Sequence, residues 1–236
     1  MNELPGNLEP VLIWTGQVML DGRLAVPHAP RGIVLFAVGP ASPHGAQEAL
    51  IAAELNRAGI ATLLVDLLTP DEQQFDIRTS HFRVDSDFLA QRLQDATAWV
   101  ANRRDLRNLP AGYFGFSVGG AAALIAAANR PDVVASIVSS GGRTDLAIDV
   151  LRQVKTPTLL IVAAENLSVL RMNREALHLL PCEKRLEIIR DATQLLDEPH
   201  SLEMVAKKTV RWFSNTLQSP IAADAYGLVE ARSAER

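Results

Sequence analysis

A serine stands at the centre of Gly-Phe-Ser-Val-Gly, residues 115–119, between a short apolar run and an alanine-rich one. A serine hydroxyl is a weak nucleophile, and it attacks a carbonyl carbon only when a neighbouring base takes its proton. Glycines on both sides suit a sharp turn between a strand and a helix. The pattern predicts that Ser117 is displayed for acyl-ester chemistry; the alternative is a chance pentapeptide in which Ser117 only caps a helix.

Five histidines could supply the base. His28 lies in an early hairpin region and His178 on a predicted helix, so both are expected at the surface. His200 lies near the start of the last predicted helix and is expected to point away from the site. His44 and His81 lie on loops that follow predicted strands. Because ligands bind beyond the carboxyl ends of strands in open α/β sheets, these two are the candidate substitute bases.

Two carboxylates could orient such a base. Glu165 follows the predicted strand PTLLIVAA, and Asp145 follows the preceding strand VVASIVSS. Both are therefore expected at the same edge of the sheet as Ser117.

Composition excludes several classes of protein. The 236 residues carry a net charge of −4 without a basic stripe, which argues against nucleic acid and anionic membranes as partners. The single cysteine, Cys182, can form no internal disulfide, and no Cys/His cluster indicates a metal. The expected partner is a small molecule, with no metal or cofactor, and a homodimer is possible.

The expected location is the cytoplasm. The first residues, MNELPG, lack the basic and apolar segments of a signal peptide. No apolar run approaches the roughly 18 residues of a membrane-spanning helix.

Short apolar runs alternate with helical patterns, which predicts a mostly parallel sheet covered by helices on both faces. The expected strands are Gly32–Gly39, Ala61–Leu68, Gly112–Phe116, Val133–Ser140, Pro157–Ala164 and Lys184–Ala192. The expected helices include Pro43–Ala58, Asp85–Arg104 and Ser201–Leu217. The segment Thr69–Arg83 is interpreted as a long polar loop.

The two ends of the chain differ from this pattern. Near the start, Asp21-Gly22 between two extended runs predicts the turn of an antiparallel hairpin. Beyond Leu217 the pattern fades, so residues 1–217 are expected to form a single domain and residues 218–236 a mobile tail or a short docking helix.

A strand, a Gly-x-Ser-x-Gly turn and a helix together resemble the nucleophile elbow of the α/β-hydrolases. Residues 10–217 are similar to the dienelactone-hydrolase-like branch of that superfamily. The stretches that carry the resemblance are RGIVLFAVG, GIATLLVDLLTPDE, RLQDATAWV, GYFGFSVGGAAAL, PTLLIVAAEN, NREAL and DATQLLDEP. The resemblance implies an α/β-hydrolase fold and a small-molecule pocket beneath the Thr69–Arg83 loop.

The resemblance also implies a triad, and this sequence departs from it. The position of the usual aspartate holds Asn166, and that of the usual histidine holds Gln194. A glutamine amide cannot accept and return the serine's proton, and asparagine has no charge to stabilise an imidazolium. We therefore expect Ser117, Asn166 and Gln194 to meet at one site with a degenerate triad.

The resemblance places the oxyanion donors at two backbone N–H groups. One is that of Val118, directly after the serine. The other usually follows a His-Gly pair, which is replaced here by Val38-Gly-Pro40. Proline has no N–H, so the second donor is expected at Ala41. Val38, Pro40 and Phe116 are expected to line the pocket.

Three functions remain open on these residues: a hydrolase of small esters or lactones with a relocated base, an inactive ligand- or partner-binding protein, and a non-hydrolytic enzyme such as a cyclase, lyase or acyl-transfer protein. The sequence favours weak or no ordinary ester or lactone hydrolysis, because the usual acid and base are missing.

Overall fold

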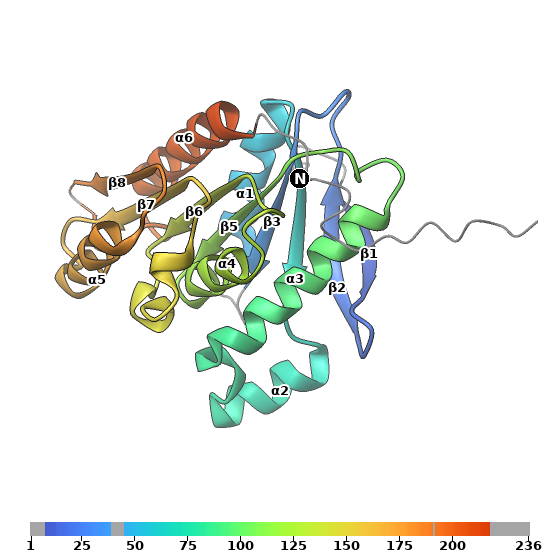
Figure 1. Ribbon diagram of the computed structural model, residues 1–236, viewed down its shortest axis with the longest axis horizontal. Helices are drawn as coiled ribbons and strands as arrows, with labels where there is room; N and C mark the ends of the chain where they lie inside the picture. Colours follow the sequence, from blue (N-terminus) through green and yellow to red (C-terminus); the bar gives the residue numbers. More distant parts are fainter. Residues whose placement is uncertain (1–7, 39–44, 191, 218–236) are drawn as a thin grey trace, which may run out of the picture.

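The structure is a computed structural model that describes residues 8–38, 45–190 and 192–217. An eight-stranded sheet runs through the molecule in the order β1-β2-β4-β3-β5-β6-β7-β8 (Figure 1). The strands are β1 Glu9–Trp14, β2 Met19–Ala25, β3 Ile33–Val38, β4 Ala61–Asp66, β5 Ala111–Phe116, β6 Ser136–Ser140, β7 Thr158–Ala163 and β8 Lys184–Ile189. All six predicted apolar strands are present; five are shorter than expected, and β5 begins one residue earlier, at Ala111.

The N-terminal hairpin is present, but its turn was misplaced by the sequence argument. β1 pairs with β2 in the antiparallel sense, and the chain turns between Trp14 and Met19, where Gly16 has φ +84°. Asp21-Gly22 lies inside β2 instead. A Cβ at Gly22 would lie 2.9 Å from Cδ1 of Ile13, so this glycine serves close packing within the sheet and not a turn.

Helices cover both faces of the sheet (Figure 1). They are α1 Gly45–Arg57, α2 Pro70–Thr79, α3 Ser86–Asn102, α4 Val118–Asn129, α5 Leu167–Leu179 and α6 Pro199–Thr216, with short 3-10 turns at Phe82–Val84, Thr144–Ala147 and Leu151–Gln153. Residues of α3, α4 and α5 share one apolar core with the sheet. Residues of α1 and α6 share the other.

Helix α2 corrects the prediction of a continuous loop over residues 69–83. Thr69 caps it: its hydroxyl accepts the N–H of Glu72, and the Glu72 side chain accepts the N–H of Thr69. Pro70 occupies the first helical turn. This capping box is visible in the sequence as Thr-Pro-Asp-Glu. The helix was missed because the segment is too polar to show an apolar stripe.

Parallel pairing brings the ends of the central strands to one edge. Phe116 of β5 pairs with Ser140 of β6, and β7 pairs with β8 up to Ala163 and Ile189. The segments that follow β5, β6, β7 and β8 therefore emerge side by side. They carry Ser117, residues 141–143, Asn166 and Gln194.

Candidate active site

Ser117 occupies a strained turn between β5 and α4. Its backbone has φ +52° and ψ −117°, one of three positive φ values among the described non-glycine residues. Such a conformation is costly and persists only where the surroundings impose it. Here the N–H of Ser117 donates to the carbonyl of Ser140 at 3.2 Å, and its own carbonyl accepts the N–H of Gly120 at 3.1 Å. The sequence therefore folds locally as a nucleophile elbow.

The glycines of the pentapeptide allow the backbones at this turn to approach closely. A Cβ at Gly115 would lie 2.2 Å from the carbonyl oxygen of Gly119. A Cβ at Gly119 would lie 2.3 Å from the carbonyl oxygen of Ala37 in β3. Both distances are shorter than any real carbon contact, so the turn requires glycine at both positions.

A cavity of about 180 Å³ opens beside Ser117. Its described lining residues are Phe116, Ser117, Gly141, Arg143, Ala163, Asn166, Val169, Thr193, Gln194 and Leu195. Ser117, Asn166 and Gln194 thus line one cavity. Arg143 is the only ionisable side chain among these residues, so the described wall of the cavity offers neither a carboxylate nor an imidazole.

Asn166 also stabilises the start of a helix at this site. It caps helix α5, and its Oδ1 accepts the N–H of Val169 at 3.3 Å. No hydrogen bond joins the described side chains of Asn166 and Gln194. Both amides line the cavity, and neither is a base at neutral pH.

The backbone around Gln194 is held from two directions. Oε1 of Glu198 accepts the N–H groups of Thr193 and Gln194 at 3.0 and 3.1 Å, and these bonds lower the pKa of Glu198. Oγ1 of Thr193 donates to Oε2 of Glu165 at 2.8 Å. Glu165 is exposed and does not line the cavity. It supports the segment that carries Gln194 instead of facing Ser117.

Arg143 is a site residue that the sequence argument missed. Its backbone N–H donates to the carbonyl of Ser117 at 3.0 Å. Its Nε and Nη2 donate to the two carboxylate oxygens of Asp145 at 2.9 and 2.7 Å, and these bonds hold the pKa of Asp145 below its usual value. Asp145 is therefore engaged with Arg143 and stands outside the cavity lining. The signal for Arg143 was its place directly beyond a buried strand, after Gly141-Gly142.

The described histidines do not line the Ser117 cavity. His81 follows α2, is exposed, and packs its ring edge-on against Phe82 with centroids 5.0 Å apart. The chain between Thr69 and Arg83 contributes nothing to the described lining either. The expected pocket beneath this segment is therefore corrected to one formed by the segments after β5, β6, β7 and β8.

The remaining predicted site residues lie as follows. Phe116 lines the cavity, and Val118 is the first residue of α4, where helix N–H groups lack intrahelical partners. Val38 is buried at the end of β3 and is not in the lining. Pro40, Ala41 and His44 lie outside the described residues.

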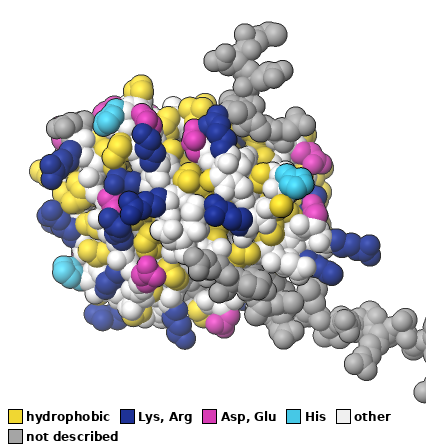
Figure 2. Space-filling model, turned by 90° about the horizontal axis from the view of Figure 1, so that it is seen from above, with side chains coloured by type: hydrophobic (Ala, Val, Ile, Leu, Met, Phe, Trp, Pro, Cys, Tyr) yellow, Lys and Arg dark blue, Asp and Glu magenta, His cyan; other side chains and the backbone are white. Residues whose placement is uncertain are grey.

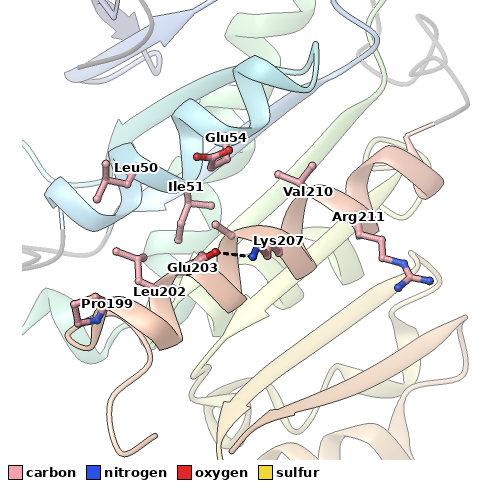
Figure 3. Close-up of a pocket in the computed structure, with 10 residues that line it drawn as sticks. Leu50, Ile51, Glu54, Pro199, Leu202, Glu203, Lys207, Val210 and Arg211 are labelled. Atoms are coloured by element: carbon pink, nitrogen blue, oxygen red, sulfur yellow. Dashed lines mark hydrogen bonds and ion pairs between the residues drawn. The ribbon is translucent and has the colours of Figure 1, made fainter. Parts of the chain in front are cut away.

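A larger cavity of about 590 Å³ lies elsewhere, between α1 and α6 (Figure 3). Its wall is mostly apolar, with Leu50 and Ile51 of α1 on one side and Leu202 of α6 on the other. It shares no lining residue with the Ser117 cavity. The strained serine, and not cavity size, identifies the candidate active site.

No cluster of three or more His, Cys, Asp or Glu side chains among the described residues could hold a metal ion. None of the described helices is both long and apolar enough to span a bilayer. On the face shown in Figure 2, basic, acidic and apolar side chains are interspersed.

Comparisons with known proteins agree with this geometry. The model of the dienelactone hydrolase family matches residues 20–180. A curated protein of Mycobacterium tuberculosis, named "Putative phosphoribosyl transferase", is 45% identical over 213 residues in each of two strains. That match covers 90% of this chain and 47% of the relative. The chain therefore spans about half the length of the curated relatives it matches.

Solved structures show the same fold. A dienelactone hydrolase from Anabaena variabilis superposes with a TM-score of 0.85 at 45% identity, covering 90% of this chain and 99% of that one. Est1E from Butyrivibrio proteoclasticus gives a TM-score of 0.69 at 12% identity, covering 88% and 98%. The second likeness concerns the fold alone.

Proposed function

Because the chain belongs to the dienelactone hydrolase family, we propose that it binds a small molecule at Ser117 and has weak or no ordinary ester or lactone hydrolase activity. The chemistry proposed for this pocket needs no cofactor or metal. The proposal also places the protein in the cytoplasm and allows it to form a homodimer.

The composition of the Ser117 cavity carries this proposal. Ordinary serine hydrolysis needs a base that takes the hydroxyl proton and returns it to the leaving group. The described cavity wall presents two neutral amides and one arginine. In subtilisin, loss of the histidine alone costs about 10⁶ in turnover. A deficit of that size would remove useful hydrolysis while leaving the pocket able to bind.

The elbow retains the features that suit ligand binding. A carbonyl or other acceptor beside Ser117 can accept the N–H of Val118 at the start of α4, a position favoured by the helix dipole. The side-chain amides of Asn166 and Gln194 can each donate an N–H to a ligand. The Asn166 oxygen is already used in capping α5. The same arrangement could serve a cyclase, lyase or acyl-transfer reaction that needs no triad base.

The name of the mycobacterial relatives does not transfer directly. It describes proteins about twice as long as the matched segment, and this chain covers 47% of them. Phosphoribosyl diphosphate therefore enters only as one of the ligands to be tested.

The decisive measurement compares wild type with Ser117→Ala. We expect wild type to hydrolyse p-nitrophenyl acetate no faster than Ser117→Ala, and to label slowly or not at all with a fluorophosphonate. Both proteins should have the same melting temperature. Fast hydrolysis by wild type that Ser117→Ala abolishes would show a live hydrolase, with its base supplied from outside the described cavity wall. His44→Ala and His81→Ala would then identify that base.

A second measurement concerns binding. We expect small esters, lactones or phosphoribosyl diphosphate that occupy the pocket to raise the melting temperature of wild type. A bulky change at the cavity wall, Ala163→Phe, should abolish the effect. If no such compound does so, the small-molecule proposal loses its support and partner binding becomes the better reading.

A further inference from the structure

Strand β1 forms one edge of the eight-stranded sheet (Figure 1). Among the described strands it pairs with β2 alone, so one side of its backbone has no partner strand there. An edge of this kind can pair with a strand of another chain. Three strands, β2, β4 and β3, separate β1 from β5, which leads to Ser117. The function proposed for Ser117 therefore leaves this edge unused.

The turn after β1 determines which backbone groups of the strand face the open side. The N–H of Thr15 donates to the carbonyl of Val18 at 3.0 Å, and the pairing of β1 with β2 continues from there residue by residue. Hydrogen-bonded and non-hydrogen-bonded pairs alternate in an antiparallel ladder. Pro10, Leu12 and Trp14 therefore occupy non-hydrogen-bonded positions. The carbonyls of all three, and the N–H groups of Leu12 and Trp14, point away from β2.

Large apolar side chains are exposed at the same place. Leu12 is 59% exposed and Trp14 is 56% exposed. Both lie on one face of the strand, because they are two positions apart. Met19 of β2 pairs with Trp14, shares this face and is 43% exposed. An exposed apolar cluster beside unpaired backbone groups is typical of a surface that contacts another protein chain.

The two edges of the sheet differ in charge. At the opposite edge, β8 carries Lys184, Arg185 and Glu187 among its six residues. Charged side chains on an edge strand oppose its pairing with another chain. In β1 the only charged residue is Glu9. The β1 edge is therefore the one whose charge permits pairing.

We propose that β1 pairs in the antiparallel sense with β1 of a second copy of this chain, about a two-fold axis at Leu12. Leu12 then exchanges two hydrogen bonds with the partner's Leu12. Trp14 donates its N–H to the carbonyl of the partner's Pro10, and its ring packs against that proline. The two Glu9 carboxylates lie at opposite ends of the contact. This surface is the one for the homodimer that the proposed function allows, and it does not depend on the chemistry at Ser117.

Charged variants at Leu12 test the two-fold axis. Sedimentation equilibrium of the full chain should show wild type in a monomer–dimer equilibrium. Leu12→Lys and Leu12→Glu should each be monomeric, because like charges then face each other across the axis. An equimolar mixture of the two variants should form a dimer again, because the lysine of one chain then faces the glutamate of the other.

Two proline changes test the backbone register. Leu12→Pro removes an N–H that faces the open side, so the circular dichroism spectrum should be unchanged while the dimer is lost. Pro10→Ala supplies an N–H opposite the carbonyl of the partner's Trp14. It should lower the dissociation constant of the dimer by about tenfold, because two hydrogen bonds are added across the axis.

Leu50→Lys is the matched control, since Leu50 is 46% exposed and lines the α1–α6 groove. It should leave the dimer intact. Ser117→Ala should do the same, so failure of this proposal and failure of the function proposed for Ser117 are distinguishable. Three results would overturn the proposal: a wild-type chain that is monomeric at every concentration, a dimer dissociated by Leu50→Lys but not by the Leu12 variants, or a mixture of Leu12→Lys and Leu12→Glu that stays monomeric.

Discussion

Two neutral amides decide the chemistry available to Ser117. Asn166 and Gln194 line the same cavity as the serine. Neither can move a proton at neutral pH, yet both can donate an N–H. Asn166 also caps α5, so the fold retains a use for this position without catalysis. Aspartate caps helices as well as asparagine does, which makes the position suitable for repair.

Restoring the acid and the base should restore hydrolysis. We expect Gln194→His combined with Asn166→Asp to hydrolyse p-nitrophenyl acetate at least about 10²-fold faster than wild type and to label with a fluorophosphonate at Ser117. Each single change should do little, because an imidazole without its orienting acid, or an acid without an imidazole, lacks the coupled function. Burst kinetics would measure the acyl-enzyme step.

The control for this repair is the triple variant that also carries Ser117→Ala, which should be inert. Pro40 limits the gain if an oxyanion donor is missing there, since one such donor is worth roughly 10²–10³ in turnover. Adding Pro40→Gly should then raise the rate further. A folded double variant that stays inert even with Pro40→Gly would contradict the assignment of these two positions.

At the scale of elements, the elbow depends on how closely α4 approaches β3. A methyl group at Gly119 would meet the carbonyl oxygen of Ala37 at 2.3 Å. We expect Gly119→Ala to lower the free energy of unfolding by about 2–4 kcal/mol, because the backbone of one element must shift. Urea denaturation measures the change.

Gly45→Ala is the matched control. Gly45 begins α1, and among the described residues the nearest atom to an added Cβ is Nη2 of Arg23 at 4.0 Å. Alanine is the better helix former, so this change should leave stability unchanged or raise it slightly. Equal effects of the two substitutions would show that the close approach of α4 to β3 does not limit stability.

Helix α1 carries a buried carboxyl group that makes stability depend on pH. Glu48 is 1% exposed, and its burial, assisted by the charge of Asp66 and opposed by Arg23, raises its pKa from 4.5 to about 8. The folded state therefore holds a proton that the unfolded state releases above pH 4.5. Stability should fall as pH rises from about 4.5 to 8, and level off above that range.

Glu48→Gln should remove this loss of stability at high pH, because glutamine has no proton to lose. We expect the variant to be more stable than wild type at pH 8, by on the order of 3–5 kcal/mol, and little changed at pH 4.5. Melting temperatures across pH 4.5–8.5 provide the measurement. A wild-type stability that rises steadily over this range, with a parallel curve for Glu48→Gln, would show that Glu48 is ionised in the folded protein.

At the scale of the whole molecule, α6 closes one face of the sheet. Phe213 is fully buried and lies against Gly112 of β5, where a Cβ would come within 2.6 Å of its ring. Leu217 is 6% exposed and packs over Gly32. The described apolar core therefore extends to Leu217.

Truncation tests the proposal that residues 1–217 suffice as a domain. A chain ending at Leu217 should melt within about 3 °C of the full chain, because the described core is retained. A chain ending at Arg211 should melt at least about 10 °C lower or fail to fold, because it loses Trp212 and Phe213. Circular dichroism measures both. A large loss in the longer truncation would show that residues 218–236 contribute to the core.

Much of this architecture could be predicted because its signals are local. Apolar runs such as residues 61–66 indicate buried strands, and the glycines around Ser117 indicate a tight turn. The family resemblance added the correspondence of Asn166 and Gln194, and the structure places both beside Ser117. Where local signals competed, the sequence misled: Asp21-Gly22 resembles a turn, yet Gly22 lies in a strand paired on both sides, with Val11 of β1 and Val65 of β4.

The rest depended on contacts between segments far apart in the chain. Arg143 joins the cavity through the pairing of β5 with β6, and the same tertiary structure holds it against Asp145. Glu165 and Glu198 are 33 positions apart in the sequence, yet the side chains of both accept hydrogen bonds from Thr193. Sequence spacing determined which residues end the strands, because strand and helix periodicity is local. Only the tertiary structure decided which of those residues face Ser117, since side-chain direction and ion pairing depend on packing between strands and helices.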